Sequence, residues 1–179
     1  MRVLALDPGT TESAYAVVTG DYRPVEFGKI PNTTMLDFAM ATRRQIDHVV
    51  IEMIGHYGTG MPAGQTTFDT CVWIGRFIQA LDDFHGLEAE VIKRGPVKIH
   101  HCGSSRAKDP NVTAALVDRF TPGATNFGKG TKDQPGWFYG FAKDAWAAYA
   151  VAVWKLDQLL ISNGDRGGPQ VLDRATVGE

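Results

Sequence analysis

The hydrophobic pattern at the start of the chain predicts two buried strands joined by a tight turn. Residues 3–6 are four consecutive apolar residues, and residues 14–18 form a second strand-like run. Apolar runs without alternation are typical of strands that are covered on both faces. The Pro8-Gly9 pair between the two runs favours a turn. We therefore expect a β-hairpin in which Asp7 stands where the first strand ends.

The rest of the pattern changes between strand-like and helix-like segments. Further short strands are expected at residues 25–30, 48–54 and 90–92. Helices are expected at residues 35–45, 66–84, 109–120 and 143–160. The last of these helices is apolar nearly all round, which predicts that it is buried. The order of elements predicts an α/β fold, in which a mixed five-stranded sheet is flanked by helices on both faces.

Segments rich in glycine and proline separate these elements. Residues 55–64 contain four glycines together with Tyr57, and residues 121–140 are rich in glycine, proline and threonine. We expect both segments to be loops, the second of them mobile. The chain has no internal repeat and no linker that divides it. One domain is therefore expected over residues 1–161, followed by a flexible tail at 162–179.

Composition excludes some functional classes without identifying one. The 179 residues carry a net charge of −2, so a surface that binds nucleic acid must be a local one. No apolar run approaches the ~20 residues needed to cross a bilayer, and the N-terminus has no signal-peptide pattern. Cys71 and Cys102 have no ligand spacing and indicate reduced thiols. A soluble cytoplasmic protein without a membrane partner is expected.

Three acids at the ends of predicted elements are candidate metal ligands. Asp7 and Glu52 lie near strand ends, and Asp144 lies in the first turn of the last helix. Each has an ordinary alternative: a turn that ends a strand, a surface glutamate, or an anion stabilised by ~0.3–1 kcal/mol at a helix N-terminus. Three carboxylates in one poorly solvated space would repel one another without a cation. Hard oxygen ligands favour Mg²⁺ or Mn²⁺.

The motifs around these acids resemble a known family. They are Leu6-Asp7-Pro8-Gly9-Thr10-Thr11, Val50-Ile51-Glu52, a basic segment with Val97-Lys98 and Arg106-Ala107-Lys108, and Asp144-Ala145 at the start of an alanine-rich helix. In this order, over residues 2–155, they resemble the RuvC Holliday-junction resolvases, with the phage-encoded branch most similar. The resemblance implies an RNase H-like fold, a homodimer, and a nuclease that cuts four-way DNA junctions at two symmetric phosphodiesters.

The resemblance also implies roles for the three acids. Asp7 matches the metal ligand on the family's first strand, and Glu52 matches its second acid. Asp144 matches an acid of the final-helix motif. With two Mg²⁺ or Mn²⁺ ions in each active site, Asp7 would bridge the pair, and the ions would activate water and stabilise the attacking and leaving oxygens.

One carboxylate of the family pattern is missing. The final helix of the family usually offers two acids three residues apart. Here the second position is Ala147 or, in the other register, Phe141. Asp69 and Asp133 are possible substitutes. The pattern therefore leaves three firm ligands and does not establish how the second ion is held.

A local basic segment is the expected DNA-binding surface. Lys108 would lie near the scissile phosphate and stabilise its developing charge, although a solvated loop lysine is the ordinary alternative. The His100-His101 pair could touch phosphate or could simply end a helix. The residues expected to contact DNA are Tyr57, Lys93, Arg94, Lys98, Arg106 and Lys108.

Aromatic and apolar residues of the central segment suggest two further roles. Tyr57 could cover an unpaired base, with Phe68 as the other candidate; packing on its own subunit is the alternative for Tyr57. The helix at 66–84, with Phe68, Val72, Ile78 and Leu81, is either the dimer interface or part of the core.

Three other functions are compatible with parts of the sequence. The Asp-Pro-Gly-Thr turn also resembles the phosphate loop of actin-like ATPases and sugar kinases. Those proteins need two such domains, and the chain has no second copy, so no nucleotide cofactor is expected. A YqgF-like RNA nuclease and a non-catalytic DNA-binding protein of the same fold are the remaining alternatives.

Overall fold

The computed structural model describes residues 1–41, 46–55 and 63–162. A five-stranded sheet with the order β3-β2-β1-β4-β5 forms its centre. The first three strands form an antiparallel meander, and the other two run parallel to β1. The strands are β1 (Arg2–Asp7), β2 (Glu12–Thr19), β3 (Pro24–Pro31), β4 (His48–Met53) and β5 (Ala89–Lys93). The mixed sheet predicted from the element order is thus confirmed.

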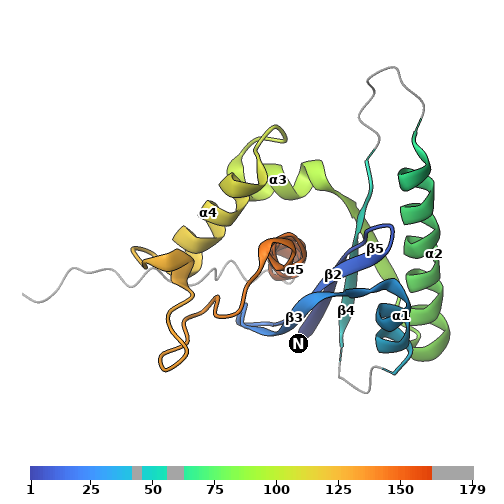
Figure 1. Cartoon of the computed structure of the whole chain (residues 1–179), viewed down its shortest axis with the longest axis horizontal. Helices are drawn as coiled ribbons and strands as arrows, with labels where there is room; N and C mark the ends of the chain where they lie inside the picture. Colours follow the sequence, from blue (N-terminus) through green and yellow to red (C-terminus); the bar gives the residue numbers. More distant parts are fainter. Residues whose placement is uncertain (42–45, 56–62, 163–179) are drawn as a thin grey trace, which may run out of the picture.

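Helices cover both faces of the sheet (Figure 1). One apolar core lies between the sheet and the first two helices, and a second lies between the sheet and the remaining helices. The helices are α1 (Asn32–Ala41), α2 (Gln65–His85), α3 (Arg94–Cys102), α4 (Asp109–Phe120) and α5 (Lys143–Ser162), with a 3₁₀ turn, η1 (Asn126–Gly128), before α5. None of these helices in the described residues is long and apolar enough to span a membrane.

Helix α5 is the buried centre of the second core. It packs directly against β1 and β2, and Figure 1 shows it end-on between the sheet and the arch made by α3 and α4. Its side chains from Ala148 to Trp154 are all buried, as the all-round apolar pattern predicts. Because the start of α5 lies near the end of β1, the fold brings Asp144 toward Asp7.

The structure differs from the sequence predictions in two segments. Residues 94–102 form helix α3, which the sequence did not assign, because Gly95-Pro96 is normally a turn signal. Proline is compatible with a first helical turn, where its missing N–H has no intrahelical partner. The loop at 121–140, for which the sequence predicts no regular element, contains the turn η1 and the fully buried side chain of Phe138, and its expected mobility stays a prediction.

Parts of other predictions fall outside the described residues. The helix expected at 35–45 begins earlier, at Asn32, and is described to Ala41. Tyr57 and most of its glycine-rich loop are not among the described residues. The tail expected from Ser162 begins with the last residue of α5, and residues 163–179 lie outside the description. The division into a domain and a tail stays a prediction.

Candidate functional site

A rigid turn fixes Asp7 at the end of central strand β1. Gly9 must be glycine, because a Cβ atom there would lie 2.5 Å from the backbone oxygen of Glu12. Buried Asn32 donates a hydrogen bond to the carbonyl oxygen of Gly9 (2.9 Å) and accepts one from the hydroxyl of Ser13 (2.7 Å). The Asp-Pro-Gly turn is therefore tied to the start of α1, which fixes the backbone directly after Asp7.

Glu52 reaches the same edge of the sheet from β4. The two strands run parallel, with Leu6 paired to Ile51, so their carboxyl ends coincide. The Glu52 side chain is buried. Asp144 approaches from the first turn of α5 and forms an ion pair with Lys29 of β3 at 3.2 Å. The chain thus brings all three predicted acids to one end of the sheet.

Electrostatics at this edge are unfavourable for the ionised acids. The pKa of Asp7 is raised to about 6: burial is the main cause, Arg94 opposes it, and the charges of Asp144 and Asp109 add to the increase. The pKa of Glu52 is raised to about 7, mainly by burial and then by the neighbouring charge of Asp7, while Arg94 opposes the increase. Two neighbouring carboxylates with raised pKa values at the edge of a cavity are typical of a functional site.

Arg94 supplies most of the positive charge that is present. It is the first residue of α3, and its guanidinium donates to Glu52 Oε2 at 2.7 Å and to Asp109 Oδ1 at 2.9 Å. The structure therefore places Arg94 between two carboxylates, and its predicted contact with DNA stays a prediction. Sequence reasoning missed Asp109, although its place directly after Lys108, at the start of a predicted helix, was visible.

Two cavities meet at these acids. The basic cavity, about 650 Å³, is lined by Asp7, Pro8, Glu52, Met53, Ile54, Gly55, Arg94, Lys98, Ser105, Arg106, Ala107, Lys108 and Asp109. It brings together four of the predicted DNA-binding residues and two of the acids. Lys93 is exposed at the end of β5 and does not line it. Lys98 also forms an ion pair with Asp109 at 3.4 Å.

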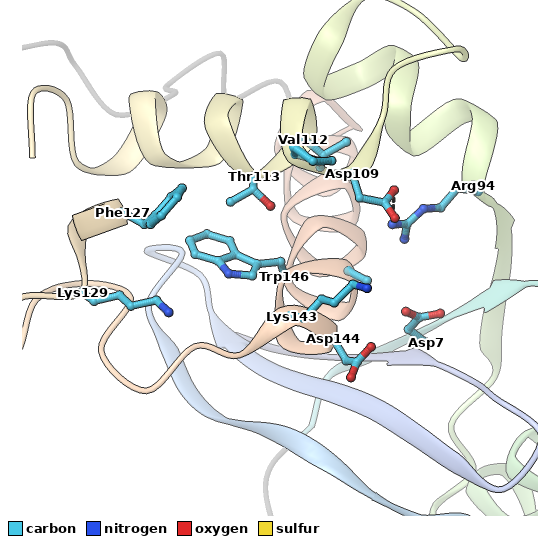
Figure 2. A pocket seen from close by; sticks show the side chains of 12 residues that line it. Asp7, Arg94, Asp109, Val112, Thr113, Phe127, Lys129, Lys143, Asp144 and Trp146 are labelled. Carbon is cyan, nitrogen blue, oxygen red and sulfur yellow. Dashed lines mark hydrogen bonds and ion pairs between the residues drawn. The ribbon is translucent and has the colours of Figure 1, made fainter. Parts of the chain in front are cut away.

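The second cavity, the Phe127 pocket, lies between α4, α5 and the loop that joins them (Figure 2). Its volume is about 370 Å³ and its lining is mostly apolar. It is lined by Asp7, Arg94, Asp109, Pro110, Val112, Thr113, Phe127, Lys129, Lys143, Asp144, Trp146 and Ala147. Sequence reasoning missed this pocket, because Phe127 comes from a segment with no periodic pattern and Trp146 belongs to a helix expected to be buried.

The carboxylate oxygens of the three acids are of the type that binds a hard cation. Their present arrangement does not surround one. Carboxylate oxygens are the ligands that Mg²⁺ and Mn²⁺ prefer. Within the described ranges, no group of three or more Asp, Glu, His or Cys residues is close enough to hold a metal ion. Glu52 is engaged by Arg94, and Asp144 is engaged by Lys29. Binding of a cation would require these ion pairs to open.

The suggested substitutes for the missing acid do not reach this site. Asp69 lies on α2, where its carboxylate accepts a hydrogen bond from Gln65, and Asp133 lies exposed in the loop before α5. Neither residue lines either cavity. Asp109 is the additional acid beside Asp7.

The histidine pair at the end of α3 contacts helix α5. His100 Nε2 lies 2.6 Å from an Asp157 oxygen, and His101 Nε2 lies 2.9 Å from the carbonyl oxygen of Ala150. Burial lowers the pKa of His101 to about 4, so its ring is neutral at physiological pH. Neither histidine lines the cavities, which favours the structural interpretation of the pair.

The four residues of α2 proposed for a dimer interface fall into two groups, two in contact with the core and two exposed. Leu81 is fully buried in the first core, and Ile78 packs against that core. Phe68 and Val72 are 56% and 61% exposed and lie one helical turn apart. Only the latter two remain available for contact with a second copy.

Comparison with known proteins identifies the fold class. No protein-family model and no curated protein sequence matches the chain. The sheet order, with a buried final helix across it, defines an RNase H-like α/β fold, as predicted. The structure is similar to RuvC of Thermus thermophilus, with a TM-score of 0.63 at 15% identity over 92% of this chain and 98% of that one. It is also similar to T. thermophilus RuvC in complex with a Holliday junction substrate, with a TM-score of 0.64 at 14% identity over 92% and 97% of the two chains.

Proposed function

We propose that this protein is a structure-selective endonuclease that resolves four-way (Holliday) or other branched DNA by metal-dependent phosphodiester hydrolysis. One observation carries the proposal: half-buried Asp7 and buried Glu52, both with raised pKa values, border a basic cavity on a RuvC-like fold. Two neighbouring acids with raised pKa values are stabilised in their ionised form when a cation binds between them. The adjoining lysines and arginines are suited to binding the phosphates of a nucleic acid.

Asp7, Glu52 and Asp144 are the residues that would hold Mg²⁺ or Mn²⁺, two ions in each active site. When bound, such ions lower the pKa of water and stabilise charge on the attacking and leaving oxygens. Lys108 neutralises charge at the scissile phosphate, while Lys98 and Arg106 bind phosphates along the cavity. Lys93 extends this surface at its edge, and Tyr57 stacks on an unpaired base.

The proposed assembly is a homodimer with C2 symmetry. A four-way junction has two equivalent scissile sites, so two active sites related by a two-fold axis match its symmetry. Support comes from the exposed apolar side chains of Phe68 and Val72 on α2. Gly75, on the next turn, has nothing within 4 Å of a Cβ position, which leaves room for a close approach. Sedimentation that gives only monomer at micromolar concentration, with and without DNA, would contradict the dimer.

The proposed setting is recombination or phage DNA processing in the cytoplasm of a bacterial host. The phage-encoded branch rests on the sequence resemblance alone. A YqgF-like RNA nuclease, or a non-catalytic DNA-binding protein of this fold, is the alternative. The missing family carboxylate beside Asp144 keeps the non-catalytic alternative open.

Cleavage of three substrates separates these functions. In Mg²⁺, the protein is expected to cut a synthetic four-way junction at symmetric positions, and to leave a linear duplex of the same sequence and an RNA stem intact. Cleavage of the RNA stem alone would identify the RNA nuclease. Tight binding of the junction with no cleavage in Mg²⁺ or Mn²⁺ would identify the non-catalytic protein.

A further inference from the structure

The loop between α4 and α5 holds an aromatic side chain in an unusual conformation. Phe127 has a φ of 54°, in the left-handed region that bulky residues rarely adopt, and its side chain is 58% exposed. Its neighbours Asn126 and Gly128 are also left-handed, with φ values of 50° and 69°. Three successive residues of this kind turn the chain so that the phenyl ring stands at the surface.

The surrounding loop holds this conformation in place. Gly128 accepts a hydrogen bond through its carbonyl oxygen from the N–H of Phe138 (3.2 Å), and the N–H of Gly136 donates to Lys129 (2.8 Å). Phe138 is fully buried against the ring of Trp146. Strained residues that their surroundings fix in this way are typical of ligand contacts.

The ring of Phe127 stands at one end of the Phe127 pocket. Figure 2 shows Phe127 and Lys129 at the end farther from Asp7, Trp146 in the middle, and Lys143 between Trp146 and the acids. The pocket therefore offers aromatic surface at one end, positive charge along its side and the candidate cation site at the other end. Its volume of about 370 Å³ lies in the range of small-ligand pockets.

The occupant that matches this arrangement is one nucleotide of a nucleic acid strand. The pocket and the basic cavity share Asp7, Arg94 and Asp109, so a strand that passes these residues would have one cavity on each side. Apolar walls with an aromatic ring suit the face of a base, and the lysines suit the phosphate beside it. A base inside a duplex cannot enter such a pocket, because its edges are paired and its faces are stacked.

We propose that the Phe127 pocket binds one unpaired nucleobase of the DNA strand whose phosphate lies at Asp7, stacked on the ring of Phe127. This inference rests on the proposed function, and it names a feature of the substrate that the site selects. A four-way junction supplies unpaired bases at its centre more readily than a linear duplex does. The pocket therefore favours branched DNA at the point of cleavage.

The test is a double-mutant cycle between the ring and the base. Wild-type protein and Phe127→Gly are titrated, in Ca²⁺, with a junction that is intact or that lacks one base next to the scissile phosphate. Glycine suits the left-handed backbone, so the variant keeps the fold, which a thermal melt checks. Phe127→Tyr keeps the ring, and Tyr139→Ala removes an exposed ring of the same loop that does not line the pocket.

Removing either the ring or the base is expected to weaken binding about 5- to 100-fold, and removing both is expected to weaken it no further. Phe127→Tyr and Tyr139→Ala should behave as wild type. Two outcomes would overturn the pocket assignment even if wild-type protein cuts the junction. Either the losses of affinity from removing the ring and from removing the base multiply when both are removed, or Phe127→Gly causes no loss of affinity. Coupled losses in a protein that never cuts would retain the pocket and reject the nuclease. Absence of binding to any branched DNA would overturn the pocket as well.

Discussion

Two partly buried polar clusters lie on the same side of the sheet and differ in the direction in which the pKa values of their acids are shifted. Around Asp157, Arg119 donates two hydrogen bonds at 2.6 and 2.8 Å, while His100 and the Tyr22 hydroxyl each lie at 2.6 Å. Burial alone would raise the pKa of Asp157, but these partners hold it well below its usual range. The Asp157 cluster is complete without any ligand.

In the cluster around Asp7 and Glu52, the pKa values of the acids are raised instead of lowered. Arg94 is its main counter-charge, shared with Asp109, and burial raises the pKa values of Asp7 and Glu52 to about 6 and 7. Asp157 thus has partners that favour its ionised form, whereas burial outweighs the effect of Arg94 at Asp7 and Glu52. A cation bound at these two acids would favour their ionised form.

The largest expected effect is loss of stability at the complete cluster. Asp157→Asn leaves Arg119 and His100 without their anionic partner and should lower the free energy of unfolding by about 3 kcal/mol at pH 7. Urea unfolding measures this change. Because the pKa of Asp157 is depressed in the folded protein, its contribution is present above about pH 4 and is lost as the pH falls further.

Asp83→Asn is the matched control for this prediction. Asp83 is an exposed acid on α2 that accepts a hydrogen bond from Gln79, and its substitution should change stability by less than about 0.5 kcal/mol. An Asp157 variant as stable as this control would show that the two clusters do not differ as described.

A smaller effect of opposite sign is expected at the incomplete cluster. Since the pKa of Asp7 is raised to about 6, the folded protein keeps a proton that the unfolded chain loses near pH 4. The wild-type protein therefore loses stability as the pH rises through this window. In EDTA, Asp7→Asn should be more stable than wild type by about 1–3 kcal/mol at pH 7 and equally stable near pH 4. Thermal unfolding of both proteins at the two pH values measures the difference.

Addition of Mg²⁺ sharpens the same comparison. Mg²⁺ should raise the unfolding midpoint of the wild-type protein at pH 7 and have little effect on Asp7→Asn, because a ligand stabilises the state that binds it. A lower unfolding midpoint for Asp7→Asn than for the wild-type protein at pH 7 in EDTA would contradict the raised pKa of Asp7.

The sequence predicts what depends on local periodicity. Residues 3–6 and the helix from Lys143 carry continuous apolar patterns, so the central strand and the buried helix could be predicted, and Asp7 and Asp144 follow from their ends. Helix α3 could not be predicted, because a Gly-Pro pair normally interrupts a helix. Only the tertiary structure shows that Gly95-Pro96 lies in the first turn of a helix.

The partners of the acids depend on contacts that no local pattern contains. Arg94 and Glu52 are 42 positions apart, and Lys29 reaches Asp144 from the edge strand β3. The Phe127 pocket depends on left-handed residues in a segment whose composition predicts only a loop. For this reason Arg94 was assigned to DNA alone, and Asp109 and Phe127 were not assigned at all.

The central claim is that Asp7 belongs to a cation site that cleaves branched DNA. Its most direct test is cleavage of a synthetic four-way junction in Mg²⁺ by the wild-type protein and by Asp7→Asn, with junction affinity measured in parallel. We expect that the variant does not cut and that it binds the junction as tightly as wild type or more tightly, because one negative charge near the DNA is gone. Cleavage by Asp7→Asn at a near wild-type rate would contradict it.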